Sequence, residues 1–183
     1  MSQETRSAPS EANTGRGPFD RAPPILTHLE MRRPPEQDPT PLPDRVSFLE
    51  AHSLPVERYR RLYMEVGRQY HWGGRMLHSD DEIRAIIHHR QVRVHILLVD
   101  GFDAGFTEID ARDATMARIQ YLGLIPDYCG RGLGRLLVQH ATAAAWRLQR
   151  ERVVVTTRSL DSPRALALYR ECGFRIVGTE EMS

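Results

Sequence analysis

Apolar and polar residues alternate in two short stretches near the start of the chain. In Ile25 to Arg32 the apolar side chains fall on one side together with Thr27, and the charged ones lie largely on the other, which is the period of a half-buried strand. Five prolines between residues 33 and 44 exclude helix and sheet from that segment. A shorter alternation then predicts a second strand at Arg45 to Glu50.

Helical spacing replaces this alternation in the next part of the chain. Apolar residues recur at three- and four-residue steps from Pro55 to Tyr70, and proline suits the first position of a helix. A second helix is expected from Ser79 or Asp80, either of which can cap it, to His88. Three antiparallel strands should follow, at residues 92–99, 104–110 and 116–125.

Turn signals and alternating helices and strands complete the pattern. Asp100-Gly101 is typical of a tight hairpin between the first two of these three strands. A strand, a helix and a strand after an antiparallel meander imply a mixed α/β (α+β) sheet with helices on both faces. The elements expected after residue 125 are a glycine loop, a helix from Leu133 to Leu148, a strand at 152–157, a helix from Ser162 to Cys172 ended by Gly173, and a strand at 174–179.

Composition is ordinary for one globular domain with a tail. The 183 residues are 40% hydrophobic and 27% charged, which allows a proper core. Residues 1–24 are rich in Ser, Pro, Gly, Arg and Glu, so we expect a disordered tail there and a domain at 25–183. The 25 basic and 24 acidic residues are well mixed along the chain, and nucleic acid is therefore not an expected partner.

Cysteine usage and hydropathy bear on the compartment. The two cysteines form no C-x-x-C pair and no apolar signal segment opens the chain, so a reducing cytoplasm is expected. No apolar run approaches the roughly eighteen residues that span a membrane, and no membrane partner is expected. We expect no metal site, because metal-ligand spacing is lacking at His88, His89, His95 and His140.

The glycine loop carries the clearest chemistry. Gly130, Gly132 and Gly134 follow an apolar strand and open a helix, so backbone N–H groups and the positive end of the helix dipole can face an anion such as a pyrophosphate. The spacing G-x-G-x-G is not the dinucleotide-binding G-x-G-x-x-G. The chain contains no lysine, which removes the nucleoside triphosphatase loop as well.

Two motifs resemble the GNAT (GCN5-related) family of N-acetyltransferases. Gly132 and Gly134 occupy the small positions of its coenzyme A loop, [RQ]-x-x-G-x-[GA], although Cys129 stands at the Arg or Gln position. The stretch SPRALALYRECGF resembles its N-x-x-A-x-x-L-Y-x-x-x-G-F helix, with Ser162 at the Asn position. A further similarity is YRRLYMEVG in the first helix. The resemblance implies a largely antiparallel mixed sheet of six or seven strands with about four helices, with little room for the seventh strand before Ser183.

The resemblance also implies direct acetyl transfer from acetyl coenzyme A to an amine. In this family Tyr169 matches the general acid that protonates the departing thiolate. The main chain of Leu122 to Ile125 would contact the pantetheine arm and help polarise the thioester. The expected coenzyme contacts are Leu124, Ile125, Cys129, Gly130, Arg131, Gly132, Leu133, Gly134, Arg135, Ser162 and Tyr169.

The residue that accepts the proton of the amine is not evident. Many relatives place a Glu on the strand before the loop, whereas this chain has Arg118 and Gln120 there. Glu108 is the first candidate for the base, followed by Glu65 and Tyr121, although Glu108 would equally suit an exposed position or a pair with an Arg.

Aromatic residues are the candidates for contact with the acceptor amine. Tyr70 and Trp72 lie between the first two helices, in the region that covers the acceptor in the family, and either select a substrate or close the edge of the core. Tyr63 and Tyr121 complete the predicted substrate-binding set. Cys129 near a helix N-terminus resembles a nucleophile, but direct transfer favours a filler role.

The sequence therefore predicts an acetyl coenzyme A-dependent N-acetyltransferase that acts on a primary amine of a small molecule or peptide. A homodimer is compatible with this prediction. The first alternative is an acyl coenzyme A-binding protein without catalysis, suggested by the departures at Cys129, Ser162 and Arg118. A more remote alternative is a phosphate-binding module of another class.

Overall fold

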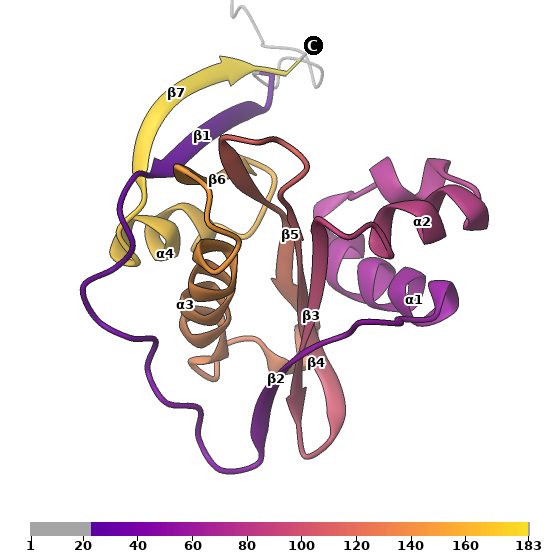
Figure 1. The fold of residues 1–183 in the computed structure, drawn as a ribbon. Helices are drawn as coiled ribbons and strands as arrows, with labels where there is room; N and C mark the ends of the chain where they lie inside the picture. The colour runs from indigo at the N-terminus through magenta and orange to yellow at the C-terminus, as the bar shows by residue number, and fades with distance from the viewer. Residues whose placement is uncertain (1–22, 183) are drawn as a thin grey trace, which may run out of the picture.

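A seven-stranded sheet forms the centre of the computed structural model, which describes residues 23–182 (Figure 1). The strands lie in the order β2-β3-β4-β5-β6-β1-β7. Their bounds are β1 Ile25–Met31, β2 Val46–Glu50, β3 Val92–Val99, β4 Phe102–Asp110, β5 Met116–Leu124, β6 Arg152–Arg158 and β7 Arg175–Glu181. The pairing of β5 with β6 is parallel and every other pairing is antiparallel, so the predicted mixed, largely antiparallel sheet is confirmed.

Four α-helices cover the two faces of the sheet. Helices α1 and α2 pack on one face, and α3 and α4 on the other (Figure 1). Their bounds are α1 Val56–Gly67, α2 Asp80–Ile87, α3 Leu133–Trp146 and α4 Ala165–Glu171, and the 3₁₀ turns are η1 Arg68–Tyr70, η2 Gly74–Leu77 and η3 Pro126–Tyr128. The number of helices and their distribution agree with the sequence prediction.

Local signals set most of the element boundaries. Ser79 caps α2 in a capping box with Glu82, as its position before the helix predicts. Asp100 and Gly101 both have positive φ, 54° and 81°, as a two-residue hairpin turn requires. Gly173 ends α4 with φ 99°.

Several boundaries differ from the prediction. Pro55 is the N-cap of α1 rather than its first helical residue, and the last predicted turn of that helix is the separate turn η1. Helix α4 begins at Ala165 instead of Ser162. The seventh strand, for which the sequence left little room before Ser183, is present as β7, within the predicted six or seven strands. The predicted disordered tail, residues 1–24, lies outside the described residues except for its last two positions.

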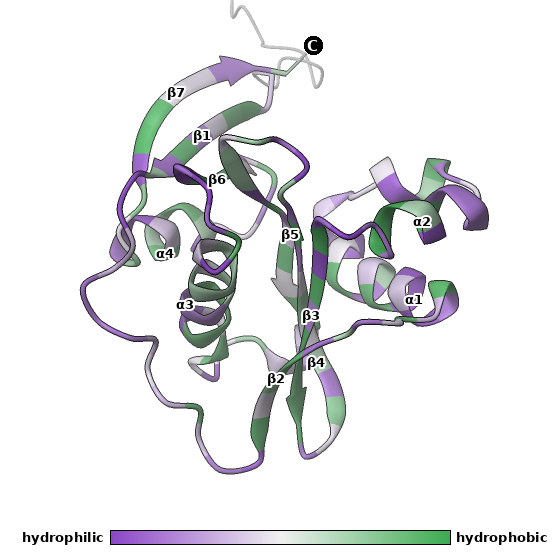
Figure 2. Cartoon of the chain, viewed as in Figure 1, coloured by the Kyte–Doolittle hydropathy of each residue, from purple (hydrophilic) through white to green (hydrophobic). Residues whose placement is uncertain are grey.

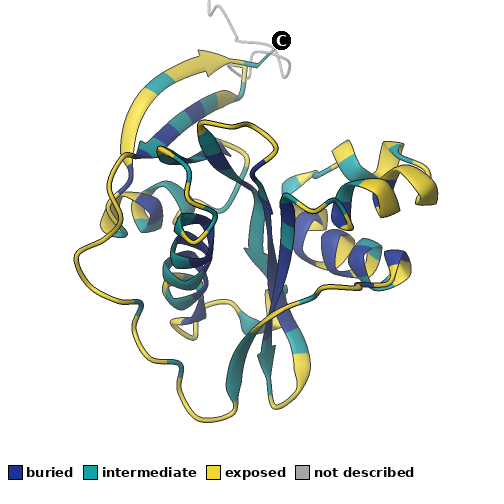
Figure 3. Ribbon diagram, viewed as in Figure 1, coloured by how far each residue is buried: buried dark blue, intermediate teal, exposed yellow. Residues whose placement is uncertain are grey.

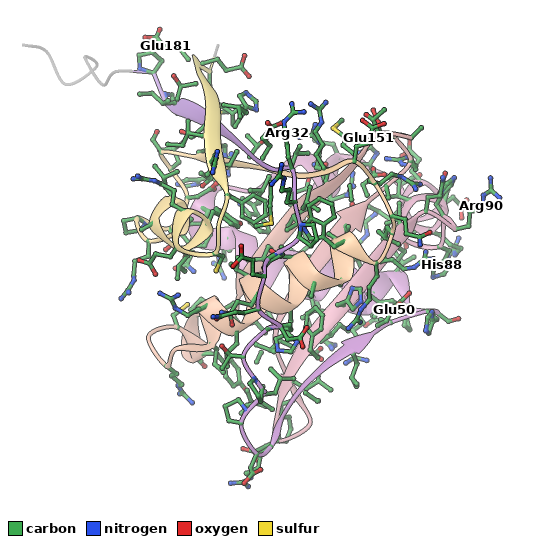
Figure 4. All side chains as sticks on the ribbon, turned by 60° about the vertical axis from the view of Figure 1, so that its left-hand side comes forward. Arg32, Glu50, His88, Arg90, Glu151 and Glu181 are labelled. Atoms are coloured by element: carbon green, nitrogen blue, oxygen red, sulfur yellow. The ribbon has the colours of Figure 1, made fainter. Side chains whose placement is uncertain are left out.

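Apolar side chains gather between the sheet and each helical layer. The strands at the centre of the sheet are hydrophobic and buried, whereas β7 at the edge is largely exposed (Figures 2 and 3). Charged residues at the ends of elements, among them Arg32, Arg90 and Glu151, project outward from the ribbon (Figure 4). The core is thus divided by the sheet, with α1 and α2 on one side of it and α3 and α4 on the other.

The sheet opens between β5 and β6. Parallel pairing of these strands ends at Ile119 opposite Val155. Beyond that point β5 stays paired with β4 as far as Leu124, and β6 stays paired with β1 as far as Arg158. A register shift in the β4–β5 ladder leaves Gln120 without a partner at the place where the strands separate. The sequence marks β5 as a strand but contains no signal for this bulge.

Candidate active site

A cleft of about 610 Å³ lies where β5 and β6 diverge. One wall comes from β5 between Ile119 and Leu124, and the other from the end of β6 and the start of α4. The glycine loop forms a third side. The cleft lies at the position that the family resemblance implies for the thioester.

The glycine loop turns through backbone conformations that favour glycine. Gly130 and Gly132 have φ of 75° and 79°, in the left-handed region. Gly132 is the N-cap of α3, and no side chain accepts a hydrogen bond from the first N–H groups of that helix. These N–H groups and the helix dipole form a site that favours an anion.

Gly132→Ala tests the conformation of this loop. A side chain at positive φ is expected to cost about 1–2 kcal/mol, and relief of that strain would rotate the N–H groups and weaken coenzyme A binding several-fold. Calorimetric titration with coenzyme A and thermal unfolding measure the two effects. Gly178→Ala in β7 is the matched control, because a Cβ there meets nothing within 4 Å and its φ is not positive. Equal behaviour of the two variants would contradict the prediction.

Most of the predicted coenzyme contacts line the cleft. Three do not: Ile125 donates its backbone N–H to the Ala104 carbonyl at 2.9 Å, the guanidinium of Arg131 lies 5.4 Å from the centre of the Tyr128 ring, and the Leu133 side chain is buried in the core. The predicted contacts that line the cleft are Leu124, Cys129, Gly130, Gly132, Gly134, Arg135, Ser162 and Tyr169.

Tyr169 lies on the wall opposite β5. It comes from α4, its ring packs edge-on against Phe174 with centroids 5.8 Å apart, and it is buried apart from its contact with the cleft. Burial, followed by the negative charge of Asp161, raises the pKa of the Tyr169 phenol above its ordinary value. The phenol therefore remains protonated at neutral pH, as a proton donor must.

Glu108 lies away from the cleft. Its side chain is 0% exposed on the face of the sheet covered by α1, and it is not among the residues that line the cleft. It accepts a hydrogen bond from the Tyr59 hydroxyl at 2.5 Å and forms an ion pair with Arg75. Burial and the Glu108 carboxylate raise the pKa of Tyr59. This geometry supports the structural role for Glu108, a pair with an Arg, rather than the role of base.

The other two candidate bases are placed differently. Glu65 is exposed on α1 and does not line the cleft. Tyr121 lines the cleft, with the guanidinium carbon of Arg75 at 5.2 Å from the centre of its ring. Gln120 also lines the cleft, whereas Arg118 lies earlier on β5 with its guanidinium 3.5 Å from the Thr156 hydroxyl.

The four predicted substrate-binding aromatic residues meet at one end of the cleft. Tyr63, Trp72 and Tyr121 lie with ring centroids 5.0 to 5.6 Å apart, and Tyr70 lies 6.5 Å from Trp72. All four line the cleft. Burial is the main cause that raises the pKa of Tyr63 to about 12, so this phenol is neutral. We call Tyr63, Tyr70, Trp72 and Tyr121 the aromatic wall.

Asp161 was not identified from the sequence. It accepts hydrogen bonds from the Trp72 indole N–H at 3.4 Å, from the Arg158 backbone N–H at 2.8 Å and from the Thr157 hydroxyl at 3.2 Å. Arg158 in turn donates to the Tyr70 carbonyl at 2.8 Å. These contacts tie the loop after α1 to the loop after β6 across the cleft. The available signal was a run of polar residues directly after a buried strand.

Residues 23–182 also bear on the expectations about metal binding and membrane spans. No group of three or more His, Cys, Asp or Glu side chains is placed to hold a metal ion in this part of the chain. Within the same residues, none of the helices has the length and apolar character needed to cross a membrane.

Comparisons with known proteins agree with this geometry. Residues 90–176 match the family described as acetyltransferase (GNAT) domain. No curated protein matches the sequence. The fold is similar to a GCN5-related N-acetyltransferase from Sphaerobacter thermophilus, with TM-score 0.62 and 15% identity over 87% of this chain and 50% of that one. The fold is also similar to the tandem GNAT protein of the clavulanic acid biosynthesis pathway, with TM-score 0.62 and 17% identity over 87% of this chain and 54% of that one.

A third similar structure is shorter. An aminoglycoside acetyltransferase from an uncultured soil metagenomic sample gives TM-score 0.59 and 13% identity over 71% of this chain and 88% of that one. The fold therefore resembles that of GNAT acetyltransferase domains. Residues 90–176 thus match the GNAT acetyltransferase domain and the fold is similar to that of GNAT proteins, and the chain spans about half the length of the Sphaerobacter and tandem proteins.

Proposed function

We propose that this protein is an acetyl coenzyme A-dependent N-acetyltransferase that transfers the acetyl group directly to a primary amine of a small molecule or peptide. The observation that carries the proposal is the cleft itself. It brings the glycine loop, the separated edge of β5 and the Tyr169 phenol around one space.

The residues present suit the coenzyme. The N–H groups at the start of α3 and in the Gly130–Gly134 loop would hold the pyrophosphate, and Arg135 and Arg164 line the cleft with positive charge. The main chain from Gln120 to Leu124 faces the gap beyond the last β5–β6 pair, where it can bind an extended arm and orient the thioester. The coenzyme supplies an activated acetyl group.

Direct transfer exchanges a carbon–sulfur bond for a carbon–nitrogen bond. The amine nitrogen would bond to the thioester carbonyl carbon as the carbon–sulfur bond breaks. Tyr169 would donate its proton to the departing thiolate, and the proton released by the nitrogen would return through solvent to the Tyr169 phenolate, so that the products are an amide, the free thiol and the restored phenol. An acid with a raised pKa suits this step because it enters the reaction protonated.

The alternative is a coenzyme-binding protein without catalysis. Two observations favour it: Cys129 and Ser162 depart from the family motifs, and Glu108 lies outside the cleft. In the alternative, the glycine loop still binds the coenzyme but no acetyl group is transferred. Both functions therefore predict coenzyme binding, and only the enzyme consumes the thioester.

Coenzyme A is expected to raise the melting temperature of the protein. A ligand that binds only the native state stabilises it by about 2.7 kcal/mol at roughly 100 times its Kd. Thermal unfolding with and without coenzyme A measures this effect, and no shift at millimolar ligand would sink both functions. Incubation with acetyl coenzyme A and an amine then distinguishes the two functions, because only an enzyme causes loss of the thioester absorbance. Absorbance is preferable to a thiol reagent because Cys129 is exposed.

A further inference from the structure

The aromatic wall is fixed in place by glycines of the elements around it. A Cβ on Gly67 would lie 2.6 Å from the Trp72 Cβ, and a Cβ on Gly123 would lie 2.4 Å from Cγ1 of Val66. Trp72 also donates its backbone N–H to the Gly67 carbonyl at 3.1 Å. Because these approaches leave no space for a side chain, the indole packs directly on the end of α1. The wall is therefore a preformed surface.

Buried polar groups support the wall from behind. The Arg75 backbone N–H donates to the Tyr63 hydroxyl at 3.3 Å, and the Arg75 guanidinium lies over the Tyr121 ring. Glu108 holds that guanidinium. Arg75 thus contacts two tyrosines of the wall, one through its backbone and one through its guanidinium, and the Glu108 carboxylate does not reach the cleft.

The described residues give the cleft no unpaired carboxylate. Among the described residues that line it, Asp161 is the sole acidic one, and its carboxylate already accepts from Trp72, Thr157 and Arg158. Three arginines line the same cleft, but Arg158 pairs with Asp161 and Arg135 pairs with Glu171, which leaves Arg164 without an ion pair among the described residues. Such a cleft offers no unpaired carboxylate to a ligand with several ammonium groups, and its apolar wall lowers the pKa of a single bound ammonium by desolvation.

From these observations we infer that the acceptor is a primary monoamine with a flat aromatic body, which packs on Trp72, Tyr121 and Tyr63 and presents its nitrogen to the gap between β5 and β6. The inference rests on the proposed function and narrows it. It also accounts for the lack of a carboxylate base in the cleft, because an apolar site without a free carboxylate receives the amine in its neutral form. Polycationic acceptors, such as the aminoglycosides named for one structural neighbour, are disfavoured.

A substrate panel on the unmodified protein tests this inference. Phenethylamine and tryptamine are compared with propylamine, spermidine and the aminoglycoside sisomicin by loss of thioester absorbance. We expect kcat/KM for the two arylalkylamines to exceed kcat/KM for propylamine by about tenfold to a hundredfold. Their kcat/KM should exceed kcat/KM for spermidine and sisomicin by at least the same factor. Equal or faster turnover of spermidine or sisomicin would overturn the inference and leave the proposed function standing.

Substitution of Trp72 tests whether the preference for aromatic amines depends on the aromatic wall. Trp72→Ala is expected to lower kcat/KM for phenethylamine by about tenfold or more, to change that for propylamine little, and to leave the Kd for coenzyme A unchanged. Trp72→Phe should retain most of the activity. Phe102→Ala, an exposed aromatic on the β3–β4 hairpin, is the matched control. Thermal unfolding shows whether each variant folds. An equal loss of kcat/KM for phenethylamine and propylamine in Trp72→Ala would contradict the role of the aromatic wall in acceptor binding.

A binding measurement keeps the two proposals distinguishable. Calorimetric titration of the coenzyme A-saturated protein with phenethylamine and with spermidine reports acceptor preference without turnover. Preferential binding of phenethylamine with no consumption of thioester would reject the enzyme and keep the aromatic acceptor site. Preferential binding of spermidine would reject the site, whatever the turnover.

Discussion

Tyr169→Phe should lower kcat by about a hundredfold to a thousandfold, because it removes the proton donor and keeps the ring. The ring continues to pack on Phe174, so the melting temperature and the Kd for coenzyme A should change little. Burial raises the pKa of the Tyr169 phenol, which stays protonated throughout the neutral range. In the unmodified protein, the loss of rate through deprotonation of this group should therefore begin only above the ordinary tyrosine pKa of about 10.

Tyr128→Phe is the matched control for this experiment. Tyr128 lies in η3 and does not line the cleft, so its hydroxyl should be dispensable. Steady-state kinetics with a saturating amine and coenzyme titrations on both variants separate kcat from binding. An unchanged kcat in Tyr169→Phe would remove Tyr169 from the role of acid and would favour a binding protein or another donor.

Glu108→Ala should destabilise the fold by about 3–5 kcal/mol, because it leaves a buried guanidinium unpaired. The Arg75 side chain is 11% exposed and Glu108 is 0% exposed, so solvent replaces little of the lost interaction. The Tyr59 hydroxyl loses its acceptor at the same time. Denaturant unfolding measures the change, and Glu108→Gln should lose less because the amide keeps a hydrogen-bonding oxygen.

Two comparisons make the Glu108 result decisive. The double variant Glu108→Ala with Arg75→Met should be more stable than Glu108→Ala alone, because it removes the unpaired charge together with its partner. A pH–rate profile of Glu108→Gln should keep the acidic limb of the unmodified protein, in which the rate falls as the general base becomes protonated. Loss of that limb would return Glu108 to the role of base and contradict the placement outside the cleft.

Several features of the site could be predicted from the sequence, because they depend on neighbours along the chain. Gly130 and Gly132 adopt positive φ in a turn between a strand and a helix, which glycine spacing alone indicates. Tyr169 sits on a helix recognisable from its motif, and that helix places it in the cleft. The aromatic wall was identified residue by residue, although its arrangement was not.

Other features depended on contacts between distant residues. Glu108 is a plausible base in the sequence, and it meets Arg75 only because the turn after α1 folds back on β4. Asp161 and Trp72 lie on two loops from opposite parts of the chain. The bulge at Gln120 comes from the register of β4 on β5. Burial and partner choice in these cases are set by pairing across the chain, which local periodicity does not encode.

The sequence by itself determined the order and type of the elements and the glycine loop that opens α3, because hydrophobic period, turn chemistry and helix capping act over a few residues. Tertiary structure alone decided that β1 enters the sheet between β6 and β7, that β5 and β6 separate into a cleft, and that its only acidic lining residue among those described, Asp161, is already paired. These outcomes follow from long-range burial and strand register, in which each group finds its partner only after the chain has folded.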